Sequence, residues 1–162
     1  MRRAALALAL VLAGCSGSED TPNVVAPDLE SVAIERGVVR DPDSREVAGL
    51  YARDGDRLCL VPAGERLRIG AFLLDEGRLA CSASGTAERT RDGLRIDFGE
   101  GCRLEARVDD GAIAFPAKLP PECARRCAPR VSFAGLRVER LSDAVSEAGA
   151  LRDPRGRALC GG

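Results

Sequence analysis

The stretch V-A-G-L-Y-A-R-D-G-D-R-L-C-L-V, residues 47–61, decides the fold class. Two apolar runs, residues 47–52 and 57–61, lie on either side of an Asp-Gly step at Asp54 and Gly55. Such a step between apolar runs is typical of a tight β-hairpin, because Gly readily adopts the positive φ that the reversal requires. Residues 47–61 are therefore predicted to form an antiparallel hairpin.

The same alternation of apolar and polar residues continues along the chain. A second turn at residues 109–111 leads into a short apolar run at 112–115, and apolar residues between 131 and 138 indicate one more strand. This pattern is typical of antiparallel strands with one buried and one solvated face. Every second residue is apolar in three further stretches: Leu67, Ile69, Ala71 and Leu73; Leu94, Ile96 and Phe98; Cys102, Leu104, Ala106 and Val108.

These strands predict a mainly β fold, a small antiparallel β-meander of about seven or eight strands. A barrel and a sandwich both fit the pattern, and the barrel is favoured because closure removes exposed strand edges. Ser142 is a predicted N-cap for a short C-terminal helix that runs to about Arg152. Residues 29–39 are ambiguous, with a strand favoured in their second half.

Composition narrows the class of protein. The chain has 162 residues, 24 basic and 25 acidic side chains and a formal charge of −1, so no basic surface predicts nucleic-acid binding. Histidine is absent, which excludes Ser-His-Asp and Cys-His nucleophilic systems and a His-ligated zinc. An enzyme that uses carboxylates alone remains an alternative, and it requires a cleft with converging Asp or Glu side chains. We expect a protein that is not an enzyme and that holds no cofactor and no metal.

The N-terminus carries a targeting signal. Arg2 and Arg3 precede an apolar run, residues 4–11, that is too short to cross a bilayer, and small residues then lead to Cys15. The segment Leu-Ala-Gly-Cys resembles the lipobox of bacterial lipoproteins. The resemblance implies that residues 1–14 are a signal peptide that is removed and that Cys15 carries the lipid, including palmitate.

The residues after the lipidation site divide into a tether and a domain. Residues 15–28 are polar and contain two prolines, which predicts a flexible lipidated tether. Residues 29–162 are predicted to form a single β-rich domain. Ser16 follows Cys15, and in the sorting scheme of such lipoproteins an Asp there would favour the inner membrane. The expected location is the cell envelope, at the outer membrane and facing the periplasm.

Six cysteines remain after Cys15, an even number in an exported chain, and this predicts three disulfides. Spacing alone does not choose among their pairings. The preferred set places Cys81–Cys102 across a strand pair, closes a small loop with Cys123–Cys127, and clamps the C-terminal tail with Cys59–Cys160. A metal site at Cys123-x-x-x-Cys127 is the less favoured alternative.

Two kinds of charged cluster are candidate binding groups. Acidic pairs at residues 41/43, 54/56 and 109/110 could offer oxygen ligands to calcium, but each lies at a Gly or Pro turn, where Asp is favoured for local hydrogen bonds. Arginines at 125, 126 and 130 surround the Cys123/Cys127 pair and could grip a carboxylate or phosphate. Solvated surface charge is the favoured interpretation of these arginines.

Residues 82–85 (Ser-Ala-Ser-Gly), 92–94 and 98–101 are similar to part of the pattern in membrane-bound inhibitors of c-type lysozyme. That family consists of lipoproteins with small disulfide-bearing β-barrels, and the resemblance implies that Ser84 and Gly85 form a motif that enters the lysozyme cleft, on a loop at the barrel rim. The family's second motif, with a Lys-Gly pair, is not matched at residues 99–101. A close-packing site in an edge strand is the alternative interpretation of Ser84 and Gly85.

The sequence thus predicts a lipid-anchored envelope lipoprotein whose disulfide-braced β-domain acts as a binding or structural module. The alternative is an inhibitor of c-type lysozyme or of another hydrolase that attacks the envelope. The expected partners are the membrane, through the lipid, and an envelope protein or lysozyme, with no nucleic acid.

Overall fold

The computed structural model describes residues 28–36 and 46–161. The chain divides into two compact units, Met1–Asp41 and Pro42–Gly162. In the first unit, helix α1 (Leu29–Glu35) has no buried residue. The ambiguous segment 29–39 therefore begins as a helix, while residues 37–39, where a strand was favoured, lie outside the described residues. So do the predicted signal peptide and Cys15.

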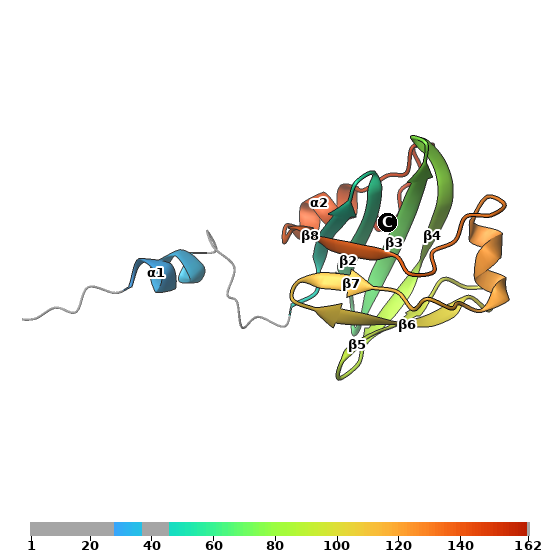
Figure 1. Ribbon diagram of the computed structural model, residues 1–162. Coiled ribbons are helices and arrows are strands. Elements are labelled where there is room, and N and C mark those ends of the chain that lie inside the picture. Colours follow the sequence, from blue (N-terminus) through green and yellow to red (C-terminus); the bar gives the residue numbers. More distant parts are fainter. Residues whose placement is uncertain (1–27, 37–45, 162) are drawn as a thin grey trace, which may run out of the picture. The chain divides into compact units, whose positions relative to one another are not determined.

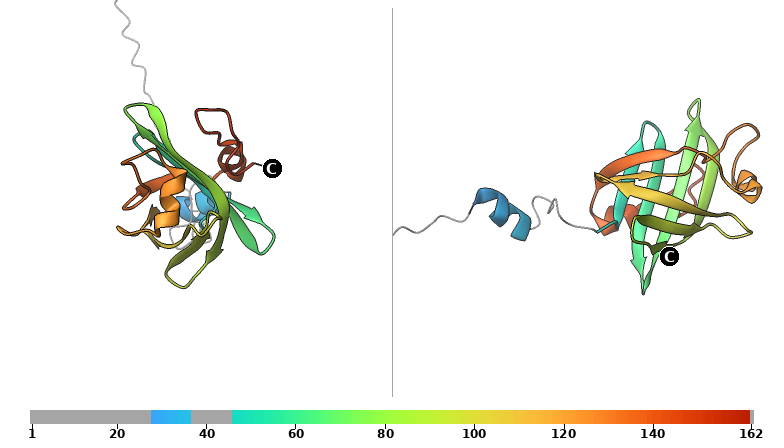
Figure 2. Two further views of the ribbon diagram at one scale, coloured as in Figure 1. Left: turned by 90° about the vertical axis from the view of Figure 1, so that its right-hand side faces the viewer. Right: turned by 60° about the horizontal axis from the view of Figure 1, so that its bottom comes forward.

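The second unit is a closed antiparallel barrel in which each strand pairs with the next and β8 pairs with β1 (Figures 1 and 2). The prediction of a small closed meander is confirmed. Its strands are β1 (Gly49–Arg53), β2 (Asp56–Ala63), β3 (Arg66–Asp75), β4 (Arg78–Arg89), β5 (Gly93–Asp97), β6 (Arg103–Asp109), β7 (Ala112–Ala114) and β8 (Arg137–Ser142).

The hairpin between β1 and β2 forms as predicted, with Arg53 opposite Asp56. Its left-handed residue is Asp54, with φ 48°, and not Gly55 as expected. Asp tolerates this conformation because its short polar side chain bonds locally to the backbone. The turn at Asp110 and Gly111 places both residues at positive φ, 44° and 76°.

The barrel interior is filled by the inward-facing residues of the alternating strands. Tyr51, Leu58 and Ile69 are fully buried there. At one end Phe98, Phe115 and Phe133 form a triangle with ring centroids 5.9–6.3 Å apart. With so few aromatic residues in the chain, this cluster supplies much of the large apolar surface of the core.

A second, smaller core lies on the outer face of β2 and β3. Outward-facing Cys59, Val61 and Phe72 pack there against helix α2 (Val145–Ala150) and the C-terminal tail, which contributes Leu159. Gly70 permits this packing, because a Cβ at that position would lie 2.5 Å from the Cβ of Leu159. The tail therefore lies directly on the sheet.

Three elements differ from the sequence prediction. The C-terminal helix is shorter, because Ser142 pairs with Leu50 at the end of β8 and cannot also be its N-cap. The strand expected at 131–138 begins only at Arg137. Upstream of it, the helical turn that a proline at its start favours is present as the 3₁₀ helix η1 (Pro121–Arg126). Strand β4 is the longest strand, yet the sequence analysis identified no alternation of apolar and polar residues along it. Of the described helices, none has the length and apolarity needed to cross a bilayer.

Candidate binding site

Three disulfides brace the barrel unit. Cys59–Cys160 forms as predicted and holds the C-terminal tail on β2. The other two predicted pairs are wrong, because the cysteines pair as Cys81–Cys127 and Cys102–Cys123.

The reason for these pairings is topological. Cys81 lies in β4 and Cys102 directly precedes β6, and β5 lies between the two strands, so they are not neighbours. Cys123 and Cys127 lie within η1 and at its C-cap. Each bonds to a different part of the barrel, so both ends of η1 are fixed. A backbone hydrogen bond from Ala128 to Ala80, 2.6 Å, adds to this attachment.

A pocket of about 370 Å³ lies where η1 and the C-terminal loop flank the beginning of β4. Residues 79–82 of β4 line it, together with residues 125–128 of the η1 segment and Arg155 and Arg157 of the loop. Figure 2 shows the orange η1 and the dark red C-terminal loop near the β3–β4 hairpin. Four arginines thus converge from two segments that are far apart in the sequence.

Asp153 organises the loop side of this pocket and has a side chain with 0% exposure. Its carboxylate accepts hydrogen bonds from the backbone N–H groups of Arg155 (2.9 Å) and Arg157 (3.1 Å) and from the Ser82 hydroxyl (3.0 Å), and the Arg157 guanidinium pairs with it at 3.1 Å. Burial alone would raise the pKa of Asp153. The hydrogen bonds from Arg157, Ser82 and Arg155, with the charge of Arg157, outweigh burial and lower the pKa.

On the opposite side, Arg126 is fixed by the β5–β6 turn. Its Nη2 donates to the carbonyl oxygen of Phe98 at 2.8 Å and pairs with Glu100 at 3.1 Å. Arg125 donates to the backbone oxygen of Glu100, also at 2.8 Å. Of the three arginines singled out in the sequence, Arg125 and Arg126 line the pocket, whereas Arg130 is exposed and does not.

The arginines of the C-terminal loop were missed by the sequence analysis. Arg155 and Arg157 lie about thirty residues beyond η1, and only the folding of the tail along β2 and β4 brings them to the pocket. The one available signal was the Cys59–Cys160 pairing, which returns the tail to the first hairpin without fixing the position of its loop.

Ser84 and Gly85 occupy the middle of a strand, not a loop. Both lie within β4, paired with Gly70 and Ile69 of β3, so the expected projecting loop at the barrel rim is wrong. Ser84 is exposed. A Cβ at Gly85 would collide with the backbone oxygen of Asp97, so this glycine is required by the close approach of β4 to the end of β5.

The acidic pairs lie at turns where the structure describes them. Asp54 and Asp56 are at the β1–β2 turn, Asp109 and Asp110 at the β6–β7 turn, and the pair at 41/43 lies outside the described residues. Within residues 28–36 and 46–161, no group of three or more His, Cys, Asp or Glu side chains is arranged to hold a metal ion.

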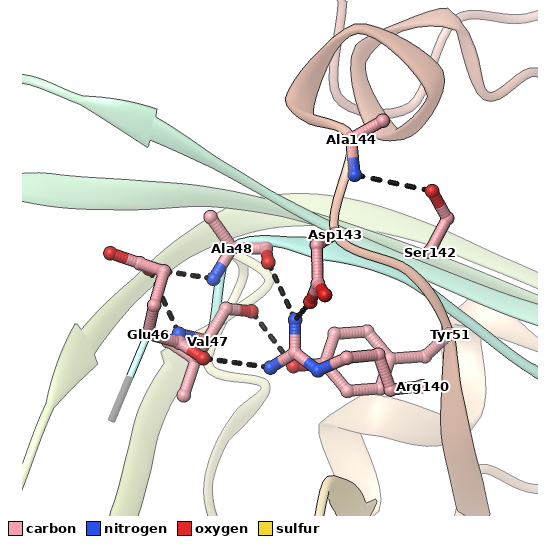
Figure 3. Close-up of polar contacts among 8 residues, drawn as sticks. All are labelled: Glu46, Val47, Ala48, Tyr51, Arg140, Ser142, Asp143 and Ala144. Atoms are coloured by element: carbon pink, nitrogen blue, oxygen red, sulfur yellow. Dashed lines mark hydrogen bonds and ion pairs between the residues drawn. The ribbon is translucent and has the colours of Figure 1, made fainter. Parts of the chain in front are cut away.

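A different arginine, Arg140 of β8, has protein acceptors for both of its Nη groups, while its Nε is buried without a hydrogen-bond partner among the described residues (Figure 3). It donates to the carbonyl oxygens of Ala48 (2.7 Å) and Glu46 (2.8 Å) and to Asp143 (2.7 Å), and it lies 4.7 Å from the centroid of the Tyr51 ring. It is a structural clamp that joins the start of the barrel to β8.

Comparison of the chain with family models, with curated proteins and with solved structures finds no match. The sequence likeness to the lysozyme inhibitors therefore rests on the short motifs at residues 82–85, 92–94 and 98–101.

Proposed function

We propose that this chain is a lipid-anchored protein of a Gram-negative cell envelope, held at the outer membrane through Cys15, whose barrel serves as a binding module and not as an enzyme. The single observation that carries the proposal is the pairing of all six cysteines after position 15 into three disulfides. Disulfides persist in oxidising compartments such as the periplasm. This pairing supports export, which the Arg2-to-Cys15 signal independently predicts.

The filled interior of the barrel and the pocket on its outer surface support a binding role for that surface. The interior is filled by Tyr51, the three phenylalanines and aliphatic side chains, so a ligand carried inside is not proposed. The arginine-lined pocket between η1 and the C-terminal loop is an open concave surface with side chains suited to recognition.

The anchoring is tested by metabolic labelling of growing cells with radioactive palmitate, followed by separation of inner and outer membranes. The wild-type chain should be labelled and recovered with the outer membrane, and Cys15→Ala should be unlabelled. Ser16→Asp is the matched control, which should keep the label and move toward the inner membrane. An unlabelled wild-type chain recovered from the cytosol with free thiols would contradict the proposal.

A second candidate function is inhibition of c-type lysozyme. The observation that favours it is the closed, disulfide-braced barrel, which is the architecture that the resemblance implies, with Ser84 exposed on its outer face. Titration of lysozyme activity with about micromolar purified protein tests it. Inhibition lost in Ser84→Arg but kept in Ser132→Arg, another exposed serine, would support it, and no inhibition would exclude it.

A further inference from the structure

The arginine-lined pocket contains more positive charge than the protein itself neutralises. Glu100 pairs with Arg126, and Asp153 pairs with Arg157. Among the described residues, no carboxylate pairs with Arg125 or Arg155, and both side chains are exposed. One of these two arginines comes from η1 and the other from the C-terminal loop, so the unneutralised charges lie on the two sides of the pocket.

The other two arginines are held in place before any ligand arrives. Arg157 is fixed by the buried Asp153 and donates to the Ser82 hydroxyl at 2.6 Å, and Arg126 is fixed by Phe98 and Glu100. The Nε of Arg126 is buried without a hydrogen-bond partner in the described chain. Groups that are already oriented lose little conformational entropy when they bind a ligand.

From this arrangement we propose that the pocket binds a phosphate group carried by a small ligand or a lipid headgroup. Guanidinium groups match the oxygens of phosphate with paired, charge-assisted hydrogen bonds. A phosphate monoester carries about two negative charges, a diphosphate carries more, and each has several oxygens, so either can engage arginines on both sides at once. The pocket volume of about 370 Å³ lies at the lower end of the range for small-molecule sites.

This inference deepens the proposed binding role of the barrel and does not depend on the lipid anchor. Two arginine pairs give a matched comparison. Arg125→Gln/Arg155→Gln removes the two unneutralised charges of the pocket. Arg66→Gln/Arg89→Gln removes the same charge from a second surface hollow, which Glu46 and Glu65 also line and where Arg66 pairs with Glu88 at 3.0 Å.

The test uses residues 15–162 with Cys15→Ser, because an attached lipid would itself insert into vesicles. Calorimetric titration with inorganic diphosphate at low salt should show one saturable site. We expect binding to weaken about tenfold or more in Arg125→Gln/Arg155→Gln and to change little in the control pair. Citrate, a tricarboxylate of similar charge at neutral pH, should bind more weakly.

Co-sedimentation with phosphatidylcholine vesicles, with and without phosphatidic acid, distinguishes the source of the phosphate. If the protein binds vesicles with phosphatidic acid and only Arg125→Gln/Arg155→Gln loses this binding, the site recognises a lipid headgroup. Diphosphate binding without vesicle binding assigns it to a free phosphate compound. No binding of either probe, equal loss in both variants, or citrate binding as tight as diphosphate would overturn the proposal. None of these results affects palmitate labelling, which tests the anchor separately.

Discussion

At the scale of the residue, Asp153 is the buried charge on which the C-terminal loop depends. Asp153→Asn keeps the size of the side chain but removes the charge that Arg157 and the backbone N–H groups stabilise. We expect the free energy of unfolding at neutral pH to fall by about 2 kcal/mol. Urea unfolding of both proteins measures this difference.

The same substitution gives a prediction for pH. The pKa of Asp153 is lower in the folded protein than its ordinary value of 3.8, so its carboxylate stabilises the fold fully above that value. The stabilisation is lost as the pH falls from about 4 through the lowered folded pKa. The stability difference between wild type and Asp153→Asn should therefore shrink in acid. A difference that stayed constant down to about pH 2 would contradict this role.

Alanine substitution at two glycines, Gly85 and Gly149, should change the stability of the fold in opposite directions. Gly85→Ala places a Cβ against the backbone oxygen of Asp97, which cannot move without opening the β4–β5 junction, and we expect a loss of at least about 2 kcal/mol. Gly149 lies in α2 with open space around it, so Gly149→Ala should stabilise by about 0.5 kcal/mol. Thermal unfolding measures both, and a tolerated Gly85→Ala would contradict the close packing.

At the scale of the element, the C-terminal tail is held by the outer core and by one disulfide. In Cys59→Ser/Cys160→Ser we expect trypsin to cut rapidly at Arg152, Arg155 and Arg157, while the barrel strands resist because their core is separate. Cys81→Ser/Cys127→Ser is the matched control, since it removes a disulfide that does not reach the tail. Equal cleavage of the tail in both variants would show that the Cys59–Cys160 bond does not hold it.

The elements also show how far the sequence could predict the structure. The hairpin was predictable from its Asp-Gly step at Asp54, and the strands β5 and β6 alternate apolar and charged residues, so their buried faces could be assigned. Strand β4 was not predictable, because its Ala, Ser and Gly side chains give little contrast, and a register shift between Leu73 and Leu74 in its partner β3 interrupts the period. Residues 79–82 of that strand line the pocket. The candidate site was therefore only half predictable, from Arg125 and Arg126 on η1.

At the scale of the whole molecule, three disulfides close loops with sequence separations of 101, 46 and 21 residues. On the chain-entropy estimate each contributes about 3–5 kcal/mol, less where the loops are nested. A domain of this size has a total stability of about 5–15 kcal/mol. The covalent bonds therefore account for a large share of what keeps the barrel folded.

We accordingly expect reduction to unfold the protein at room temperature. Circular dichroism should show a cooperative urea transition for the oxidised protein and, after reduction and thiol blocking, loss of the β signal without denaturant. Reoxidation after removal of an unblocked reductant should restore the fold and the three pairs Cys59–Cys160, Cys81–Cys127 and Cys102–Cys123 in a peptide map. A reduced chain with an unchanged urea midpoint would mean that the cores suffice alone, and the disulfides would then no longer tie folding to an oxidising compartment.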